Sequence, residues 1–119
     1  MVIVGLDTSP LNLKPQQEQA LTELKNKIKK KYEIEEILIF GSVARNEADQ
    51  ESDLDVLVLT KDKLSHEQKH VIYGITTEIN LEYGTNISIL LIQKSSWENG
   101  LYSILAIKEE VERDGVSFQ

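Results

Sequence analysis

The sequence predicts an α+β domain, a small mixed β-sheet with helices packed against it. Helical and strand patterns alternate along the chain, and short polar turns separate the apolar runs. A chain of 119 residues is long enough for one domain with a single core. We assign residues 15–119 to this domain and residues 1–14, where Pro10 follows a short apolar run, to an irregular N-terminal arm.

Three helices are expected. The first spans 15–32, because Pro15 suits a first turn and apolar residues recur with helical spacing after it. The second spans 65–83 and ends at Gly84. The third spans 101–113 and stops at Gly115, and before it Ser95 or Ser96 is expected to cap a turn that contains a buried Trp97.

The expected strands are short apolar runs at 36–40, 54–60 and 86–93, with an edge strand at 116–118. Composition narrows the class of protein further. The chain has no cysteine and no apolar run of membrane-spanning length, which favours a cytoplasmic protein without membrane association. Its net charge of −7 argues against broad, nonspecific binding of nucleic acid.

Gly41 and Ser42 directly follow the first predicted strand. A glycine permits a sharp turn and the close approach of a ligand, and Ser42 is a good N-cap for a short helix that includes Arg45. Free N–H groups at the start of a helix attract phosphate. This turn is therefore a candidate phosphate site.

Asp53 and Asp55 open the second predicted strand. Residues two apart in a strand point to the same side, so the two carboxylates should stand together. Their repulsion is relieved if a hard cation such as Mg²⁺ lies between them. A phosphate-binding turn beside a metal-binding carboxylate pair predicts a metal-bound nucleoside triphosphate as the ligand.

Gly41-Ser42, ten residues and then Asp53-x-Asp55 resembles the signature of the minimal nucleotidyltransferases, relatives of the DNA polymerase beta superfamily. The resemblance implies the nucleotidyltransferase fold and transfer of a nucleoside monophosphate from ATP or another NTP to a hydroxyl group. It implies that Asp53 and Asp55 bind Mg²⁺ or Mn²⁺, and that Gly41 and Ser42 hold the β- and γ-phosphates. Arg45 would contact a phosphate or orient the aspartates; a surface salt bridge is the alternative.

Active members of that family usually carry a third carboxylate on the next strand, and here Ser88 stands at the matching position. Asn46 also replaces the glycine that usually follows the arginine. A serine does not act as a base near neutral pH, so the rate could fall roughly a hundredfold or more. The sequence thus leaves open an active transferase, an impaired nucleotide-binding module and a plain structural domain. The family's frequent partner is a helical HEPN protein, often as toxin and antitoxin. A homo-oligomer also remains open.

Two further patterns are interpreted as solvent-exposed helix faces. His66-Glu67-Gln68-Lys69-His70 matches the zinc-protease motif, but both histidines should point away from the apolar face formed by Val71, Ile72, Ile75 and Ile79. The lysines between 25 and 31 crowd the end of the first helix, where its dipole favours cations. Contact with substrate phosphates is the alternative function of these lysines.

Overall fold

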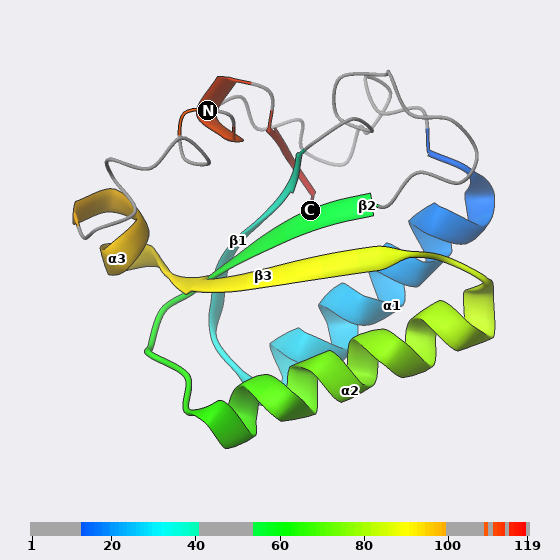
Figure 1. Ribbon diagram of the computed structural model, residues 1–119, viewed down its shortest axis with the longest axis horizontal. Helices are drawn as coiled ribbons and strands as arrows, with labels where there is room; N and C mark the ends of the chain where they lie inside the picture. Colours follow the sequence, from blue (N-terminus) through cyan, green and yellow to red (C-terminus); the bar gives the residue numbers. More distant parts are fainter. Residues whose placement is uncertain (1–12, 41–53, 100–108, 110, 114, 119) are drawn as a thin grey trace.

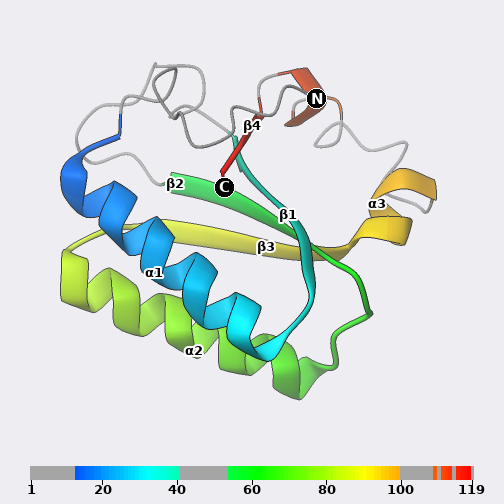
Figure 2. The same cartoon turned by 180° about the vertical axis from the view of Figure 1, so that it is seen from behind.

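The computed structural model describes residues 13–40, 54–99, 109, 111–113 and 115–118. These residues form a mixed sheet with two long helices packed on one face (Figures 1 and 2). The strands are β1 (Ile34–Phe40), β2 (Leu54–Thr60), β3 (Ile87–Gln93) and β4 (Val116–Ser117), in the order β3-β2-β1-β4. The helices are α1 (Pro15–Lys31), α2 (His66–Tyr83) and α3 (Lys94–Asn99). The predicted α+β class is confirmed.

The sheet combines antiparallel and parallel pairing. β1 runs antiparallel to β2 and to the short edge strand β4, whereas β2 and β3 are parallel. Parallel neighbours need a long crossover connection, and α2 supplies it. The carboxyl ends of β2 and β3 therefore lie at one edge of the molecule and their amino ends at the other (Figure 1).

Local sequence signals set the ends of α2. The Ser65 hydroxyl accepts a hydrogen bond from the Gln68 amide at 3.1 Å, and the Gln68 side chain accepts one from the Ser65 amide at 2.9 Å. This reciprocal pair is a capping box. At the other end Gly84 takes the left-handed conformation, with φ of 66°, that a glycine tolerates best. The predicted helix and its stop at Gly84 are confirmed, with Ser65 as the N-cap.

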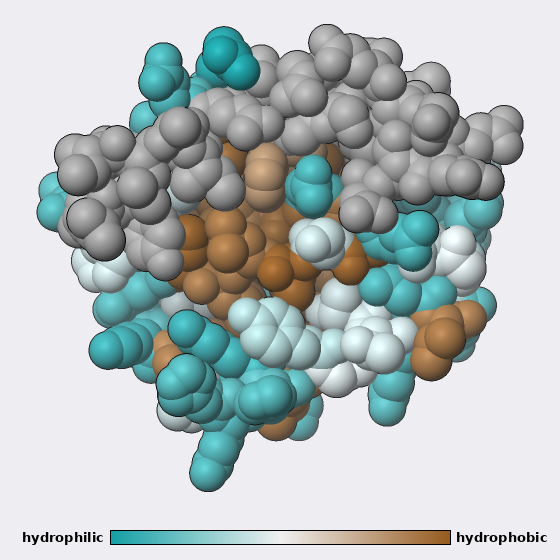
Figure 3. Space-filling view, in the orientation of Figure 1, coloured by the Kyte–Doolittle hydropathy of each residue, from teal (hydrophilic) through white to brown (hydrophobic). Residues whose placement is uncertain are grey.

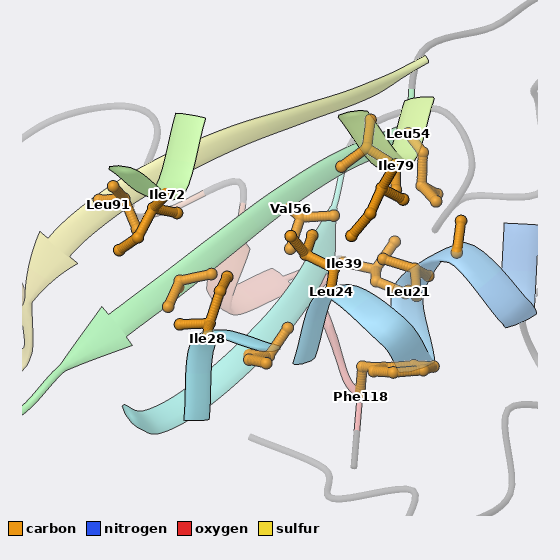
Figure 4. Close-up of a cluster of buried hydrophobic side chains, with 14 of the residues drawn as sticks. Leu21, Leu24, Ile28, Ile39, Leu54, Val56, Ile72, Ile79, Leu91 and Phe118 are labelled. Atoms are coloured by element: carbon orange, nitrogen blue, oxygen red, sulfur yellow. The ribbon is translucent and has the colours of Figure 1, made fainter. Parts of the chain in front are cut away.

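The main core lies between the sheet and helices α1 and α2 (Figure 4). The apolar residues that recur with helical spacing along α1 are buried there, and they pack against alternate residues of the central strands. We call this side of the sheet the helix face. Its buried side chains include Ala20, Leu21, Leu24, Ile28, Ile37, Ile39, Val56, Val58, Ile72 and Ile79.

The intervening strand residues point to the opposite side, which we call the second face. A smaller core forms there, and an apolar patch lies over the strands in the view of Figure 3. Trp97 of α3 packs into this core with 4% of its surface exposed, which confirms the expected burial. The buried members of this core are Leu38, Leu57, Leu59, Ile92, Trp97 and Val111.

Some boundaries differ from the sequence predictions. β1 begins at Ile34 because it pairs with Thr60 at the end of β2. The expected cap at Ser95 or Ser96 is wrong, since α3 starts at Lys94 directly after β3 and includes both serines. The edge strand is confirmed at Val116–Ser117.

Two predictions fall largely outside the described residues. Of the third helix, residues 109 and 111–113 are helical, and 101–108 and 110 are not described. Of the N-terminal arm, residues 1–12 lie outside the described ranges. In the described part of the chain, no helix is long and apolar enough to cross a membrane.

Candidate functional site

Asp55 occupies the centre of the sheet at the amino end of β2. Its partners across the two ladders are Phe40, the last residue of β1, and Ser88 of β3. All three residues alternate with helix-face positions, so their side chains belong to the second face. Asp55 is half-buried and Ser88 is exposed. A carboxylate and a hydroxyl thus stand side by side on the face that α1 and α2 leave free.

Ser88 therefore occupies the strand position beside Asp55, where the family resemblance places a third carboxylate. No aspartate or glutamate lies between Gly84 and Gln93 to replace it. The backbone register agrees with the alignment proposed from the sequence. The slower transfer expected from a serine at this position stays a prediction.

Asn80 fixes the start of β3, and the sequence analysis missed it. Its side-chain oxygen accepts hydrogen bonds from the Ile87 amide and the Thr85 hydroxyl, both at 2.8 Å. Its side-chain nitrogen donates to the Ile87 carbonyl at 3.1 Å. These bonds hold the residue before Ser88 against α2 and so set the position of Ser88 beside Asp55. The signal available in the sequence was an asparagine next to the apolar Ile79, one helical turn before Gly84.

The remaining predicted site residues are not described. Gly41, Ser42, Arg45 and Asp53 lie within residues 41–53, outside the described ranges. Their neighbours are described: β1 ends at residue 40 and β2 begins at residue 54. Because Phe40 pairs with Asp55, the described residues that flank this segment lie next to each other on the sheet. The pairing of the two aspartates and the phosphate turn stay predictions.

Glu36 lies on the second face of β1, nearer to α3. Burial raises the pKa of this carboxyl above its ordinary value of 4.5, while the nearby Lys94 ammonium group acts in the opposite direction. Glu36 and Lys94 line a cavity at this edge of the sheet. The second face thus carries acidic groups at two separate places.

The two histidines of the zinc-like motif lie at the start of α2. His66 and His70 are exposed, as expected, and His70 packs edge-on against Tyr73 with ring centroids 6.5 Å apart. Among the residues that the structure describes, no three histidine or acidic side chains are grouped to hold a metal ion. Val71, however, was expected on the apolar face and is 42% exposed, because its position is at the margin of that face.

The lysines near the carboxyl end of α1 face solvent. Lys29, Lys30 and Lys31 are exposed in its last turn. Lys27 forms a surface ion pair with Glu23 at 3.5 Å, and Lys25 lies 5.7 Å from the ring centre of Phe118. These contacts agree with a solvated basic helix end. The Lys25 contact joins α1 to the residue that follows β4.

Comparison with family models gives the class of protein to which this chain belongs, the nucleotidyltransferases. The family model described as "Polymerase beta, Nucleotidyltransferase" matches residues 22–112. This match spans most of the chain and includes all of the predicted site. The protein therefore belongs to the polymerase beta nucleotidyltransferase family.

Relatives support this assignment. Protein adenylyltransferase MntA of Thermococcus cleftensis is 32% identical over 84 residues, which cover 71% of this chain and 80% of the relative. The Methanocaldococcus jannaschii protein MJ0126 is 32% identical over 96 residues, covering 81% and 88%. Another protein of that organism, MJ0141, is 35% identical over 65 residues, and the match covers 55% of this chain but only 66% of MJ0141.

Solved structures share the fold at low sequence identity. A toxin–antitoxin structure with AMP-PNP matches with a TM-score of 0.56 and 18% identity, covering 84% of this chain and 70% of the other. A complex of tri-AMPylated Shewanella oneidensis HEPN toxin with MNT antitoxin matches with a TM-score of 0.50 and 18% identity, covering 86% and 70%. These structures confirm the predicted nucleotidyltransferase fold.

Proposed function

We propose that this protein transfers AMP from ATP to a hydroxyl group of a protein partner, with Mg²⁺ or Mn²⁺ held by Asp53 and Asp55. One observation carries the proposal. In a chain of this family, Asp55 stands at the amino end of a central strand, on the sheet face free of α1 and α2, beside the exposed Ser88. The name of the MntA relative supports adenylate as the group transferred.

The described donors suit a hard divalent ion. Asp55 offers a half-buried carboxylate and Ser88 a neighbouring hydroxyl, and Mg²⁺ prefers oxygen ligands. Strand alternation would add the Asp53 carboxylate on the same side. When bound, such an ion offsets the negative charge of the phosphates and helps to align them.

The phosphate-binding part of the site is proposed from the sequence. Gly41 and Ser42 would hold the β- and γ-phosphates through backbone N–H groups and the serine hydroxyl. Arg45 would contact a phosphate or orient the two aspartates. Since β1 ends at Phe40 opposite Asp55, a turn that begins at Gly41 starts beside the metal-binding position.

Ser88 favours a second candidate function. A hydroxyl beside Asp55 cannot replace a carboxylate as the base that takes the proton from the acceptor. The chain would then bind nucleotide with little or no transfer and act through a partner. In both versions we propose a helical HEPN-type partner, because structures of toxin–antitoxin complexes share the fold.

Titration of ATP by calorimetry, with Mg²⁺ and with a chelator, tests the nucleotide site. We expect ATP binding that requires the metal and that weakens roughly a hundredfold or more in Asp55→Asn, since a metal ligand is lost. The melting temperature should stay the same or rise, because the repulsion between the two carboxylates is relieved.

Asp62→Asn is the matched control. It makes the same chemical change just beyond the opposite end of β2, at an exposed side chain, and should leave ATP binding unchanged. Unfolding of Asp55→Asn would show that the carboxylate is structural. Unchanged binding would show that the nucleotide lies elsewhere, and the same titration with GTP, CTP and UTP tests the choice of base.

A further inference from the structure

We propose a second binding site, for a small phosphate monoester with an apolar substituent, in the cavity at the carboxyl ends of β2 and β3. This cavity has a volume of about 350 Å³. Thr60, Lys63, Lys69 and Ser96 contribute its polar lining, and Leu64 and Leu91 contribute apolar surface. The proposal goes beyond the transfer reaction and does not depend on it.

The cavity is separate from the nucleotide site. Thr60 and Gln93 are register partners at the ends of the two parallel strands, and both line the cavity. Asp55 lies five residues earlier on β2, which at about 3.3 Å per residue is roughly 16 Å away. Figure 1 shows β2 and β3 ending at the side of the molecule where α2 begins and α3 lies. Crevices at the carboxyl ends of parallel strands are common ligand sites.

Charge distinguishes this cavity from two other hollows lined by described residues. Lys63 and Lys69 line it, and none of its lining residues is acidic. The groove along α1 includes Glu18 and Glu23, and the cavity at the other sheet edge includes Glu35 and Glu36. In a chain with a net charge of −7, a cavity with two ammonium groups and no carboxylate is suited to an anion.

The two lysines also lack acidic partners in the described part of the chain. Two other lysines that flank lining residues in the sequence do have acidic partners: Lys61 pairs with Glu33 at 3.2 Å, and Lys94 pairs with Glu98 at 3.9 Å. No carboxylate of the described residues lies within 4.0 Å of the Lys63 or Lys69 ammonium group. A bound dianion would offer acceptor oxygens to both lysines.

The other lining groups narrow the class of ligand. The Ser96 hydroxyl can donate to a phosphate oxygen, and the amino end of α2 adds partial positive charge at the same edge of the sheet. Leu64 and Leu91 are 8% and 7% exposed, so an apolar substituent could cover the surface that remains. The volume is at the low end for ligand pockets, which indicates one small molecule.

NMR titration of the isotope-labelled full chain tests the site, with inorganic phosphate and phenyl phosphate as probes and a chelator to exclude metal. We expect saturable shifts of the Thr60, Gln93 and Ser96 amide signals, with tighter binding of phenyl phosphate. Lys63→Met and Lys69→Met should each weaken binding about tenfold or more, since each removes a charge-assisted hydrogen bond.

Lys31→Met removes the same charge from the exposed end of α1 and should change nothing. Asp55→Asn should bind both probes like the unaltered chain, which separates this site from the nucleotide site. Three results would overturn the proposal: shifts that do not saturate, an equal loss in Lys31→Met, or loss of binding in Asp55→Asn.

Discussion

The two faces of the sheet differ although the same strands build them. On the helix face, alternate residues of β1, β2 and β3 are apolar and meet α1 and α2. On the second face, the alternation begins with Asp55 on β2 and Ser88 on β3 and becomes apolar only farther along each strand. Adjacent residues such as Asp55 and Val56 therefore have opposite roles.

With the proposed function, this difference separates the residues that stabilise the fold from those that would bind ligand. The helix face buries large side chains, and burial of apolar surface is the main contribution to folding. The second face can then keep a polar group such as Ser88 exposed on the edge strand β3. The same group buried without a hydrogen-bond partner would cost stability. Substitutions on the two faces should change different measured quantities.

The largest expected effect is on the helix face. Leu24→Ala should lower the free energy of unfolding by about 2–5 kcal/mol, because Leu24 is 2% exposed in the main core. Denaturant unfolding measures the loss. ATP affinity well below the melting temperature should not change, since the site is on the other face.

Leu81→Ala is the matched control, because Leu81 is 81% exposed on α2. It should change the free energy of unfolding by less than about 0.5 kcal/mol. An equal loss in the two variants would contradict the assignment of the core to the helix face.

A second prediction concerns the polar end of the second face. Ser88→Asp should raise transfer of label from α-labelled ATP to acceptor proteins in a cell extract, by roughly a hundredfold if the missing base limits the rate. Without metal the same variant should melt at a lower temperature, because a carboxylate is added beside Asp55. Added Mg²⁺ should reverse that loss.

Ser88→Ala serves as the control for Ser88→Asp, since it removes the hydroxyl without adding a charge. It should leave the transfer rate low. If Ser88→Asp gains no activity although ATP still binds, then the base comes from elsewhere, and a partner chain is the next place to look.

The smallest expected effect is the pH dependence of Glu36 on the second face. Its folded-state pKa is raised, chiefly by burial, so its contribution to stability is full below about pH 4.5 and is lost as the pH rises through the folded-state pKa. Glu36→Gln cannot ionise there. It should melt slightly above the unaltered chain at pH 7 and equally with it at low pH.

Glu35→Gln removes the same charge from an exposed neighbour. Thermal melts of both variants between low pH and pH 7 separate the effect of burying Glu36 from the effect of the chain's net charge. An equal gain at pH 7 in both variants would mean that relief of the chain's net negative charge, and not burial of Glu36, explains the result.

Much of the fold follows from local patterns. Pro15, Ser65 and Gly84 mark helix ends because backbone geometry and capping act within a few residues, and the structure confirms each of these positions. The three longer strands could also be predicted, since apolar stretches of this length are typical of buried strands. The cap expected at Ser95 or Ser96 failed because α3 follows β3 without a connecting turn.

The sequence by itself predicted most of the elements and the family resemblance, and the chemistry of Asp53, Asp55 and the Gly41-Ser42 turn stays a prediction made from it. Tertiary structure gave the register that sets Ser88 beside Asp55, in agreement with the alignment, and it alone decided that Asn80 holds the start of β3 and that Lys63 and Lys69 line one cavity. The physical reason is the separation along the chain over which each interaction acts. Caps and periodicity act between near neighbours in the chain, whereas strand pairing joins residues that are 33 positions apart, as in Asp55 and Ser88.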